Sequence, residues 1–495
     1  MTRFNRVRAK ARSRSDSKAP GRSRPRGKPQ EESAPKPRRN PKYAERARRR
    51  MILEAEEAAR RMPELNLQML AQDTMEKYGF ENKFSLVVNA KANAHDGFTV
   101  KKVGATLPDL RHLLWSSIDS YYSHDLDQLE YCERGQRREI LVKVAIADVD
   151  AFAPKDSILD ERAQVNATSV YPGKESFPML PEQLSGDLSA FPADCDRLAI
   201  VVEFAVLLTG DVRFGKIYRA FVRNRAQMAS GDVSALLGAA GPDGGQGRQA
   251  DEAEGGQGVS ETQELFEEMP EIVEQLRLQE EASERLSKHR AEMAGAPVAA
   301  DKTLGLCIVE TDRAKLIIGN FMACANRGMM GLLEGARISP MRKVVVIPKD
   351  WYGMVEFAGA KGFQLPADPD AHALSDFLAK EKKEDPGGFS DLSREIAALL
   401  GPGEYALFDK REPVEYFCIA DADNLIGTSP NQKYMDLVVQ RLVKAAAAHT
   451  ATPYSKAELS ELAAWCTERE NAAKKVERTI KYAQTPETAR EKENE

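Results

Sequence analysis

The 495-residue sequence has no apolar stretch near the roughly 18 to 20 residues that a membrane-spanning helix requires. Its basic N-terminus is not followed by an apolar segment and a small-residue cleavage site, so we expect no secretory signal peptide. The six cysteines lack CxxC spacing and partnering histidines, which argues against a zinc site and a disulfide framework. We therefore expect a cytoplasmic protein that does not enter a membrane.

Acidic residues are scarce at one end of the chain. Residues 1–50 contain 19 Lys and Arg against 4 Asp and Glu, whereas the rest contains 52 against 72. We expect residues 1–40 to form a disordered basic tail, because they offer almost no apolar side chains for a core. Such a tail could neutralise nucleic-acid phosphates. A solubilising tail is the alternative, and a transit peptide is a weaker one because amphipathicity is poor.

The remaining pattern predicts helices and strands in mixture, and hence a mixed α/β fold. Residues 41–78 favour two helices interrupted near Pro63, and a Gly-rich polar insertion occupies residues 238–259. β-like runs fall at residues 84–90, 139–146, 197–208 and 342–348. Further helices are predicted at residues 261–293, 314–335, 432–449 and 456–482.

Three carboxylates gather in the segment "IDSYYSHDLDQLEY". Asp119, Asp125 and Asp127 fall within nine residues and Gln128 follows them. Ionised carboxylates in a protein interior need partners or a metal, and hard oxygen ligands suit Mg²⁺ or Mn²⁺. By spacing alone the segment could also be a turn or a solvated face. It does not fit a calcium-binding loop, because the required glycine and terminal glutamate are missing.

The segment "IDSYYSHDLDQ" is followed in order by IADV, TSVY and "PMLPEQLS". Together these segments resemble the ribonuclease II and ribonuclease R family, the RNB exoribonucleases, whose signature IDxxxxxDxDD is followed by IADV, TSVY and PMLPExLS elements. Later matches are "NFMACANRGM", "GTSPNQKYMDLVVQRLVK" and "CTERENAAKKVER". The resemblance implies a single large RNB-like catalytic domain over residues 105–480. A helical N-terminal region (41–104) would precede it and a polar tail (481–495) would follow, without the usual cold-shock and S1 domains.

The resemblance also implies roles for individual residues. Asp119, Asp125 and Asp127 would be catalytic and would hold Mg²⁺, or Mn²⁺, together with Gln128. The substrate, single-stranded RNA, would be bound by four further residues: Tyr171, Thr428, Ser429 and Glu468. Tyr171 would stack on the terminal nucleotide, although a tyrosine beside Pro172 and Gly173 is also typical of an ordinary turn. Thr428 and Ser429 belong to the TSP turn, which has a structural role as well.

Some positions depart from the family pattern. Gln128 replaces an acidic metal ligand, and its amide oxygen can coordinate but carries no charge. Gln432 stands at the catalytic position where the family has an arginine that clamps the scissile phosphate, and glutamine lacks that charged fork. Gln440 replaces a histidine, and Gly319 and Asn320 replace an acidic pair.

Two functions follow from the resemblance. The first is a metal-dependent exoribonuclease that hydrolyses single-stranded RNA from the 3′ end to nucleoside 5′-monophosphates, slowed by Gln128 and Gln432. The alternative is an RNB-like RNA-binding or regulatory protein with weak or no hydrolytic activity. The sequence leaves protein partners unknown.

Overall fold

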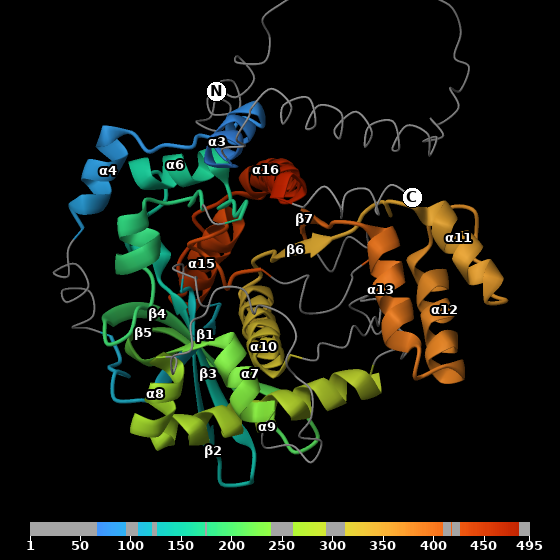
Figure 1. The fold of residues 1–495 in the computed structure, drawn as a ribbon, viewed down its shortest axis with the longest axis horizontal. Coiled ribbons are helices and arrows are strands. Elements are labelled where there is room, and N and C mark those ends of the chain that lie inside the picture. The colour runs from blue at the N-terminus through green and yellow to red at the C-terminus, as the bar shows by residue number, and fades with distance from the viewer. Residues whose placement is uncertain are drawn as a thin grey trace, which may run out of the picture. The chain divides into compact units, whose positions relative to one another are not determined.

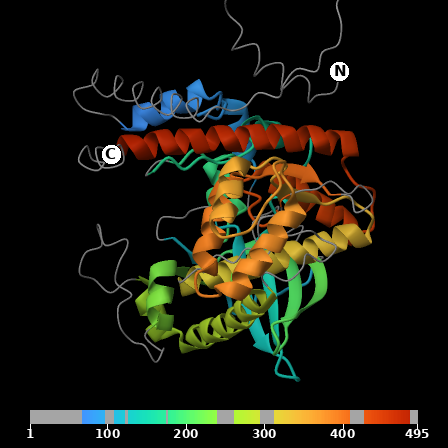
Figure 2. The same ribbon diagram turned by 90° about the vertical axis from the view of Figure 1, so that its right-hand side faces the viewer.

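A computed structural model of the chain is shown in two views (Figure 1 and Figure 2). It describes residues 67–95, 107–120, 126–173, 176–238, 261–293, 312–408, 417 and 426–484. The basic tail, the first of the two helices predicted within 41–78, the Gly-rich insertion after Gly238, Asp125 and residues 485–495 lie outside these ranges.

The chain divides into two compact units, described here separately. The small unit takes in Met1–Lys83, Val170–Phe177 and Asn471–Glu495. The large unit takes in Phe84–Ser169 and Pro178–Glu470.

A closed five-stranded barrel forms the centre of the large unit. Its strands, in the order in which they pair, are β1 (Trp115–Asp119), β2 (Gln128–Arg134), β3 (Ile140–Ala147), β4 (Asp196–Val206) and β5 (Val212–Ala229). Neighbouring strands are antiparallel, except that β1 closes the barrel parallel to β5. Closure leaves no unpaired edge. The strands predicted at residues 139–146 and 197–208 are confirmed as β3 and β4.

Helices pack along the barrel (Figure 1). They are α7 (Ser230–Gly238), α8 (Glu261–Glu268), α9 (Pro270–Met293) and α10 (Arg313–Gly335). α10 approaches the barrel closely at Gly328, where a Cβ atom would lie 3.1 Å from side-chain atoms of Val202 and Phe214. By length and composition α10 could cross a bilayer, but 56% of its most apolar stretch is buried in the chain. It is therefore built as a core helix.

A three-helix group with its own apolar core follows α10. Its helices are α11 (Trp351–Ala360), α12 (Ala371–Glu384) and α13 (Phe389–Leu400), drawn in orange side by side in Figure 1 and Figure 2. Met354, Phe377 and Ile396 are fully buried between them. A two-stranded sheet of β6 (Met341–Val344) and β7 (Glu404–Leu407) flanks the group. The strand predicted at residues 342–348 is thus confirmed only in its first half.

The remaining elements of the large unit surround the barrel's connections. They are α4 (Leu86–Asn93), η1 (Val149–Ala151), α6 (Ile158–Asn166), η2 (Gln183–Leu188), α15 (Tyr434–Ala447) and the first half of α16 (Lys456–Gln484). Nearly every residue of α15 is buried. Polar side chains on such a helix must therefore find partners within the protein.

The small unit has a separate apolar core. Its described part consists of α3 (Leu67–Lys77), the second half of α16 and an isolated antiparallel bridge between Val170 and Phe177. The buried side chains are Ala71, Met75, Phe80, Val170, Phe177, Ala473, Val476 and Ile480. α3 confirms the second helix predicted within residues 41–78.

One prediction of secondary structure was wrong. The run "FSLVVNA" was expected to be β-like, but Leu86–Asn93 forms α4. Ser85 caps this helix, because its hydroxyl accepts a hydrogen bond from the Val88 N–H. Leu86 is 88% exposed and Val87 is 62% exposed, so neither gains the cross-strand packing on which β-propensity depends.

Candidate active site

The acidic segment spans the connection between β1 and β2. Asp119 is the last residue of β1, Gln128 is the first residue of β2, and the two strands pair with Ser116 opposite Glu130. Asp119 and Asp127 therefore lie at the two ends of one connection. Asp125, between them, is outside the described residues.

Asp127 is tied to the segment that carries the TSP turn. Its Oδ1 accepts a hydrogen bond from the backbone N–H of Asn431 at 3.1 Å, and its own carbonyl accepts one from Ala147 at 2.9 Å. Asn431 is itself held through both ends of its amide, to the Ser189 hydroxyl at 2.6 Å and the Ser189 carbonyl at 3.2 Å. Residues 304 positions apart thus meet at one buried carboxylate.

The turn has a fixed shape. Ser429 donates its N–H to the Asp436 carboxylate at 2.9 Å, and its carbonyl accepts hydrogen bonds from the N–H groups of Gln432 and Lys433. Thr428 is buried. Burial raises the pKa of Asp436, while nearby Lys433 and the backbone hydrogen bonds counteract the rise. The structural role expected for the turn is therefore visible in its hydrogen bonds.

The TSVY and PMLPE segments join the same place. Ser169 donates its N–H to the Gln432 carbonyl at 2.7 Å, and its hydroxyl accepts from the Met179 N–H at 2.9 Å. Thr168 forms an antiparallel bridge with Lys433. The acidic segment, the TSVY segment, the PMLPE segment and the TSP turn are separate in the sequence. In the structure they pack together near the start of β2.

Glu130 is a residue that sequence reasoning missed. It lies two positions after Gln128 on β2, and Gln128 Nε2 donates to Glu130 Oε1 at 2.5 Å. Glu130 is only 2% exposed. Burial raises the pKa of Glu130 to about 8, the Gln128 hydrogen bond lowers this pKa, and the charge of Asp119 raises it. The two-residue periodicity of strands could have revealed it, since residues i and i+2 share a face.

Asp119, which is half-buried, is a second acid with a raised pKa. Burial raises the pKa of Asp119 to about 6, and a hydrogen bond with Ser117 offsets part of the rise. Within the described residues no ion pair joins Asp119 or Glu130 to a cationic side chain. The two acids thus lie close enough to repel each other, with no described cation to compensate them.

The donor chemistry suits a hard divalent cation. In the described part of the chain, Oε1 of Gln128 and Oε2 of Glu130 are buried and accept no hydrogen bond. Buried oxygens in this condition are costly unless a cation or donor reaches them. The described residues alone do not place three His, Cys, Asp or Glu side chains around one point. A complete set of ligands therefore has to draw on Gln128 or on Asp125.

Other residues singled out from the sequence lie elsewhere. Tyr171 belongs to the small unit, where its side chain is 41% exposed and its N–H donates to Glu477 Oε1 at 3.2 Å. Glu468 is exposed on α16. Asn320 is buried on α10, where its amide bonds to Arg290 and to Ser283 of α9. Asn320 therefore joins two helices.

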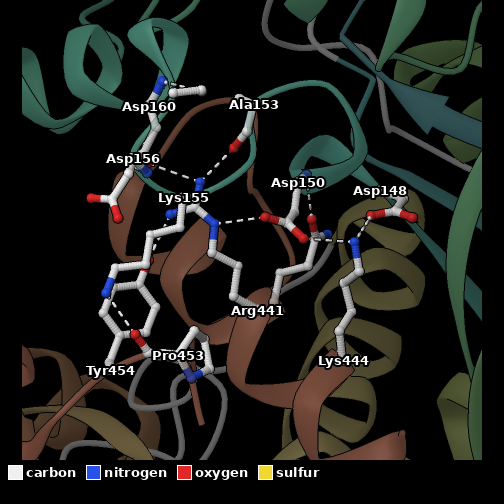
Figure 3. Close-up of polar contacts among 12 residues, drawn as sticks. Asp148, Asp150, Ala153, Lys155, Asp156, Asp160, Arg441, Lys444, Pro453 and Tyr454 are labelled. Atoms are coloured by element: carbon white, nitrogen blue, oxygen red, sulfur yellow. Dashed lines mark hydrogen bonds and ion pairs between the residues drawn. The ribbon is translucent and has the colours of Figure 1, made fainter. Parts of the chain in front are cut away.

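A second acidic cluster lies just after β3 (Figure 3). Arg441 of α15 pairs with Asp150 at 2.7 Å and with Asp160 at 2.8 Å, and Lys444 pairs with Asp148 at 2.9 Å and with Asp150 at 2.7 Å. Burial alone would raise the pKa of Asp150, but the charges of both cations outweigh it and hold that pKa below its ordinary value.

Gln440 completes this cluster. Its Oε1 accepts from the Asp150 N–H at 3.0 Å and its Nε2 donates to the Ala147 carbonyl at 2.6 Å. Both contacts fix the residues that follow β3. Because β3 pairs with β2 at Ile146 and Gln128, the cluster supports the strand on which the acidic site is built.

Comparison with known proteins gives a uniform result. A family model described as the RNB domain matches residues 108–449. Ribonuclease R of Vibrio parahaemolyticus is 26% identical over 362 residues, covering 69% of this chain and 39% of that protein. The structure of Mycoplasma genitalium RNase R in complex with ribose-methylated single-stranded RNA matches with a TM-score of 0.63 at 20% identity, over 84% of this chain and 64% of that one.

A further fold match is yeast Ssd1, a pseudonuclease, with a TM-score of 0.56 at 12% identity over 77% of this chain and 45% of that one. The barrel and the joined signature segments define an RNB domain, and the family model covers more than half of the sequence. The chain belongs to the RNB family. It spans 39% of the length of the Vibrio ribonuclease R.

Proposed function

We propose that the chain is a divalent-metal-dependent exoribonuclease that shortens single-stranded RNA from the 3′ end and releases nucleoside 5′-monophosphates. The observation that carries this proposal is a pair of acids, the buried Glu130 and the half-buried Asp119, without a described cationic partner beside Asp127 and the TSP turn. Mg²⁺, or Mn²⁺ in its place, and a cytoplasmic location are part of the proposal.

Each residue has a distinct task in this proposal. Asp119, Asp125 and Asp127 hold the cation with the amide oxygen of Gln128, and the Asn431 N–H orients the Asp127 carboxylate. When bound, the cation supplies the positive charge that activates water and stabilises the leaving oxygen.

Four further residues hold the substrate in this proposal. Tyr171 stacks on the terminal base, Glu468 contacts the last ribose, and Thr428 and Ser429 position the phosphate. Gln432 offers an uncharged amide where a guanidinium would bind the phosphate through two hydrogen bonds, which slows the reaction.

A second function is an RNB-like protein that binds RNA without hydrolysing it. Gln128 and Gln432 favour it, because both remove charge from the site. The fold similarity to yeast Ssd1, a pseudonuclease, supports the same alternative.

One experiment separates the two functions. The purified protein is incubated with 5′-labelled single-stranded RNA in Mg²⁺, in Mn²⁺ or in EDTA. The Asp127→Asn variant is compared with Asp391→Asn, the same change at an aspartate that is 78% exposed on α13. Asparagine keeps an oxygen that can accept the Asn431 N–H, so Asp127→Asn preserves the fold while it removes a charged ligand.

A nuclease gives a metal-dependent ladder in the wild type and in Asp391→Asn, and a rate at least about 10²-fold lower in Asp127→Asn. Intact RNA that still shifts in a gel supports the binding protein. A ladder of equal rate in both variants would show a contaminating nuclease and contradict the assigned site.

A further inference from the structure

A surface pocket of about 350 Å³ lies at the start of β4, away from the acidic connection. Its lining residues are Asp109, Arg111, His112, Arg223 and Arg225. They come from two segments, the residues before β1 and the second half of β5, which an isolated bridge between Asp109 and Phe221 holds together. Three guanidinium groups in one pocket indicate an anion as the ligand.

Two aspartates fix two of the arginines. Arg111 binds Asp109 at 2.7 Å and Asp196 at 2.9 Å, and Arg223 binds Asp196 at 2.6 Å. Arg111 also packs over the ring of Phe221, 4.6 Å from its centre. The guanidinium planes are therefore held in place before any ligand arrives, which lowers the entropy cost of binding.

Arg225 supplies the charge that the aspartates do not balance. It donates to the Arg111 carbonyl at 3.2 Å, and its ion pair with Asp194 is long, at 3.8 Å, to a carboxylate that is 78% exposed. About a third of the side chain remains accessible in Arg111, Arg223 and Arg225, at 35%, 32% and 33%. The residues that line the pocket, three arginines against Asp109, thus present N–H donors and a net positive charge to solvent, while Asp194 and Asp196 pair with the arginines from outside the lining.

We propose that this pocket is a phosphate-binding subsite for the backbone of single-stranded RNA. The choice of RNA rests on the proposed function. Arg225 and Ala229 share one face of β5, roughly 13 Å apart at about 3.3 Å per residue, and Ala229 pairs with Asp119. One RNA strand is long enough to reach both places. Through this subsite the barrel itself would bind RNA, without help from the basic tail.

The test measures RNA affinity in EDTA, which keeps the RNA intact, by fluorescence anisotropy over a series of salt concentrations. Arg225→Gln is the informative variant, because it leaves the Asp109, Arg111, Asp196 and Arg223 contacts in place. Arg213→Gln is the matched control. Arg213 lies at the other end of β5, 60% exposed, with Glu139 at 3.9 Å, and the substitution makes the same change in net charge.

We expect Arg225→Gln to weaken binding roughly fivefold at low salt and to reduce the slope of log K against log salt by about 0.7, the value for one lost phosphate contact on a single strand. Arg213→Gln should leave both unchanged. Equal behaviour of the two variants, with equal melting temperatures, would overturn the subsite.

Competition identifies the source of the phosphate. An unlabelled oligonucleotide should abolish the tighter binding of the unsubstituted protein at much lower concentration than inorganic phosphate or a nucleoside monophosphate. Equal potency of the three would overturn the assignment to an RNA backbone. Since hydrolysis is not measured here, loss of binding in Arg225→Gln together with an inactive wild type would refute the nuclease and keep the subsite.

Discussion

The large unit holds two acidic clusters with opposite electrostatics. After β3, Asp148, Asp150 and Asp160 each lie within 2.9 Å of an arginine or lysine nitrogen. At the β1–β2 connection, Asp119 and Glu130 have raised pKa values and no described cationic partner. Arginine and lysine side chains compensate the first cluster, whereas the described residues offer no cation to the second. A structural cluster is therefore distinguished from a functional one by whether cationic side chains neutralise its acids, more than by how many acids it contains.

The largest expected effect comes from breaking the compensated cluster. Arg441→Met leaves Asp150 and Asp160 without their shared guanidinium, and removing one partner of a buried pair costs about 3 to 5 kcal/mol. Unfolding in urea should show this loss. Arg394→Met is the control, since Arg394 is 59% exposed and its partner among the described residues is Asp391 on the same helix, a surface pair worth less than about 1 kcal/mol. Equal losses of unfolding free energy in the two variants would show that the buried cluster is no more important for stability than a surface ion pair.

The uncompensated cluster should reveal itself through pH. The pKa of Glu130 rises from 4.5 to about 8 on folding, so its contribution to stability is complete below pH 4.5 and is lost as pH rises toward 8. Without metal, the wild type should lose about 3 kcal/mol between pH 5 and 8, and Glu130→Gln should flatten this fall. Thermal unfolding in EDTA measures both.

Glu203 provides the control of opposite sign. Burial would raise the pKa of Glu203, but Lys143 and Tyr218 hold this pKa below its ordinary value. The contribution of Glu203 to stability is therefore present above pH 4.5 and lost in acid, so Glu203→Gln should not flatten the fall in stability between pH 5 and 8.

Added Mg²⁺ should raise the melting temperature of the wild type at pH 8 more than that of Glu130→Gln. A melting temperature of the metal-free wild type that stays constant between pH 5 and 8 would contradict the raised pKa of Glu130.

A smaller effect is expected from restoring an acid. Gln128→Asp adds a carboxylate to the proposed metal ligands, and the number of charged ligands tunes the affinity for hard cations. We expect Mn²⁺ to bind about tenfold more tightly, as calorimetry would show, and the metal-free protein to be less stable at pH 8 because of repulsion from Asp119 and Glu130. Gln128→Asn keeps the amide and should not tighten binding. Unchanged affinity in Gln128→Asp would place residue 128 outside the metal site.

The sequence predicted two of the five barrel strands, β3 and β4, and missed the long-range polar contacts. The alternation in residues 139–146 is local, and β3 formed there. The ion pair between Arg441 and Asp150 joins residues 291 positions apart, and no local pattern contains such a distance. Glu130 was overlooked because no strand was predicted at residues 128–134, and closure of the barrel decides which face of a strand is buried. α4 was missed because the apolar run at residues 84–90 was interpreted as a strand, whereas Ser85 caps a helix there.

The smallest effect separates the two cations of the compensated cluster. In Figure 3, Lys444 reaches both Asp148 and Asp150, but neither acid depends on it alone. Asp148 also pairs with Arg219 at 2.6 Å, and Asp150 with Arg441 at 2.7 Å. Lys444→Met should therefore cost only about 1 kcal/mol in urea unfolding, well below Arg441→Met. A loss as large as that of Arg441→Met would show that the cluster acts as one unit, in which compensation is shared among all its charges.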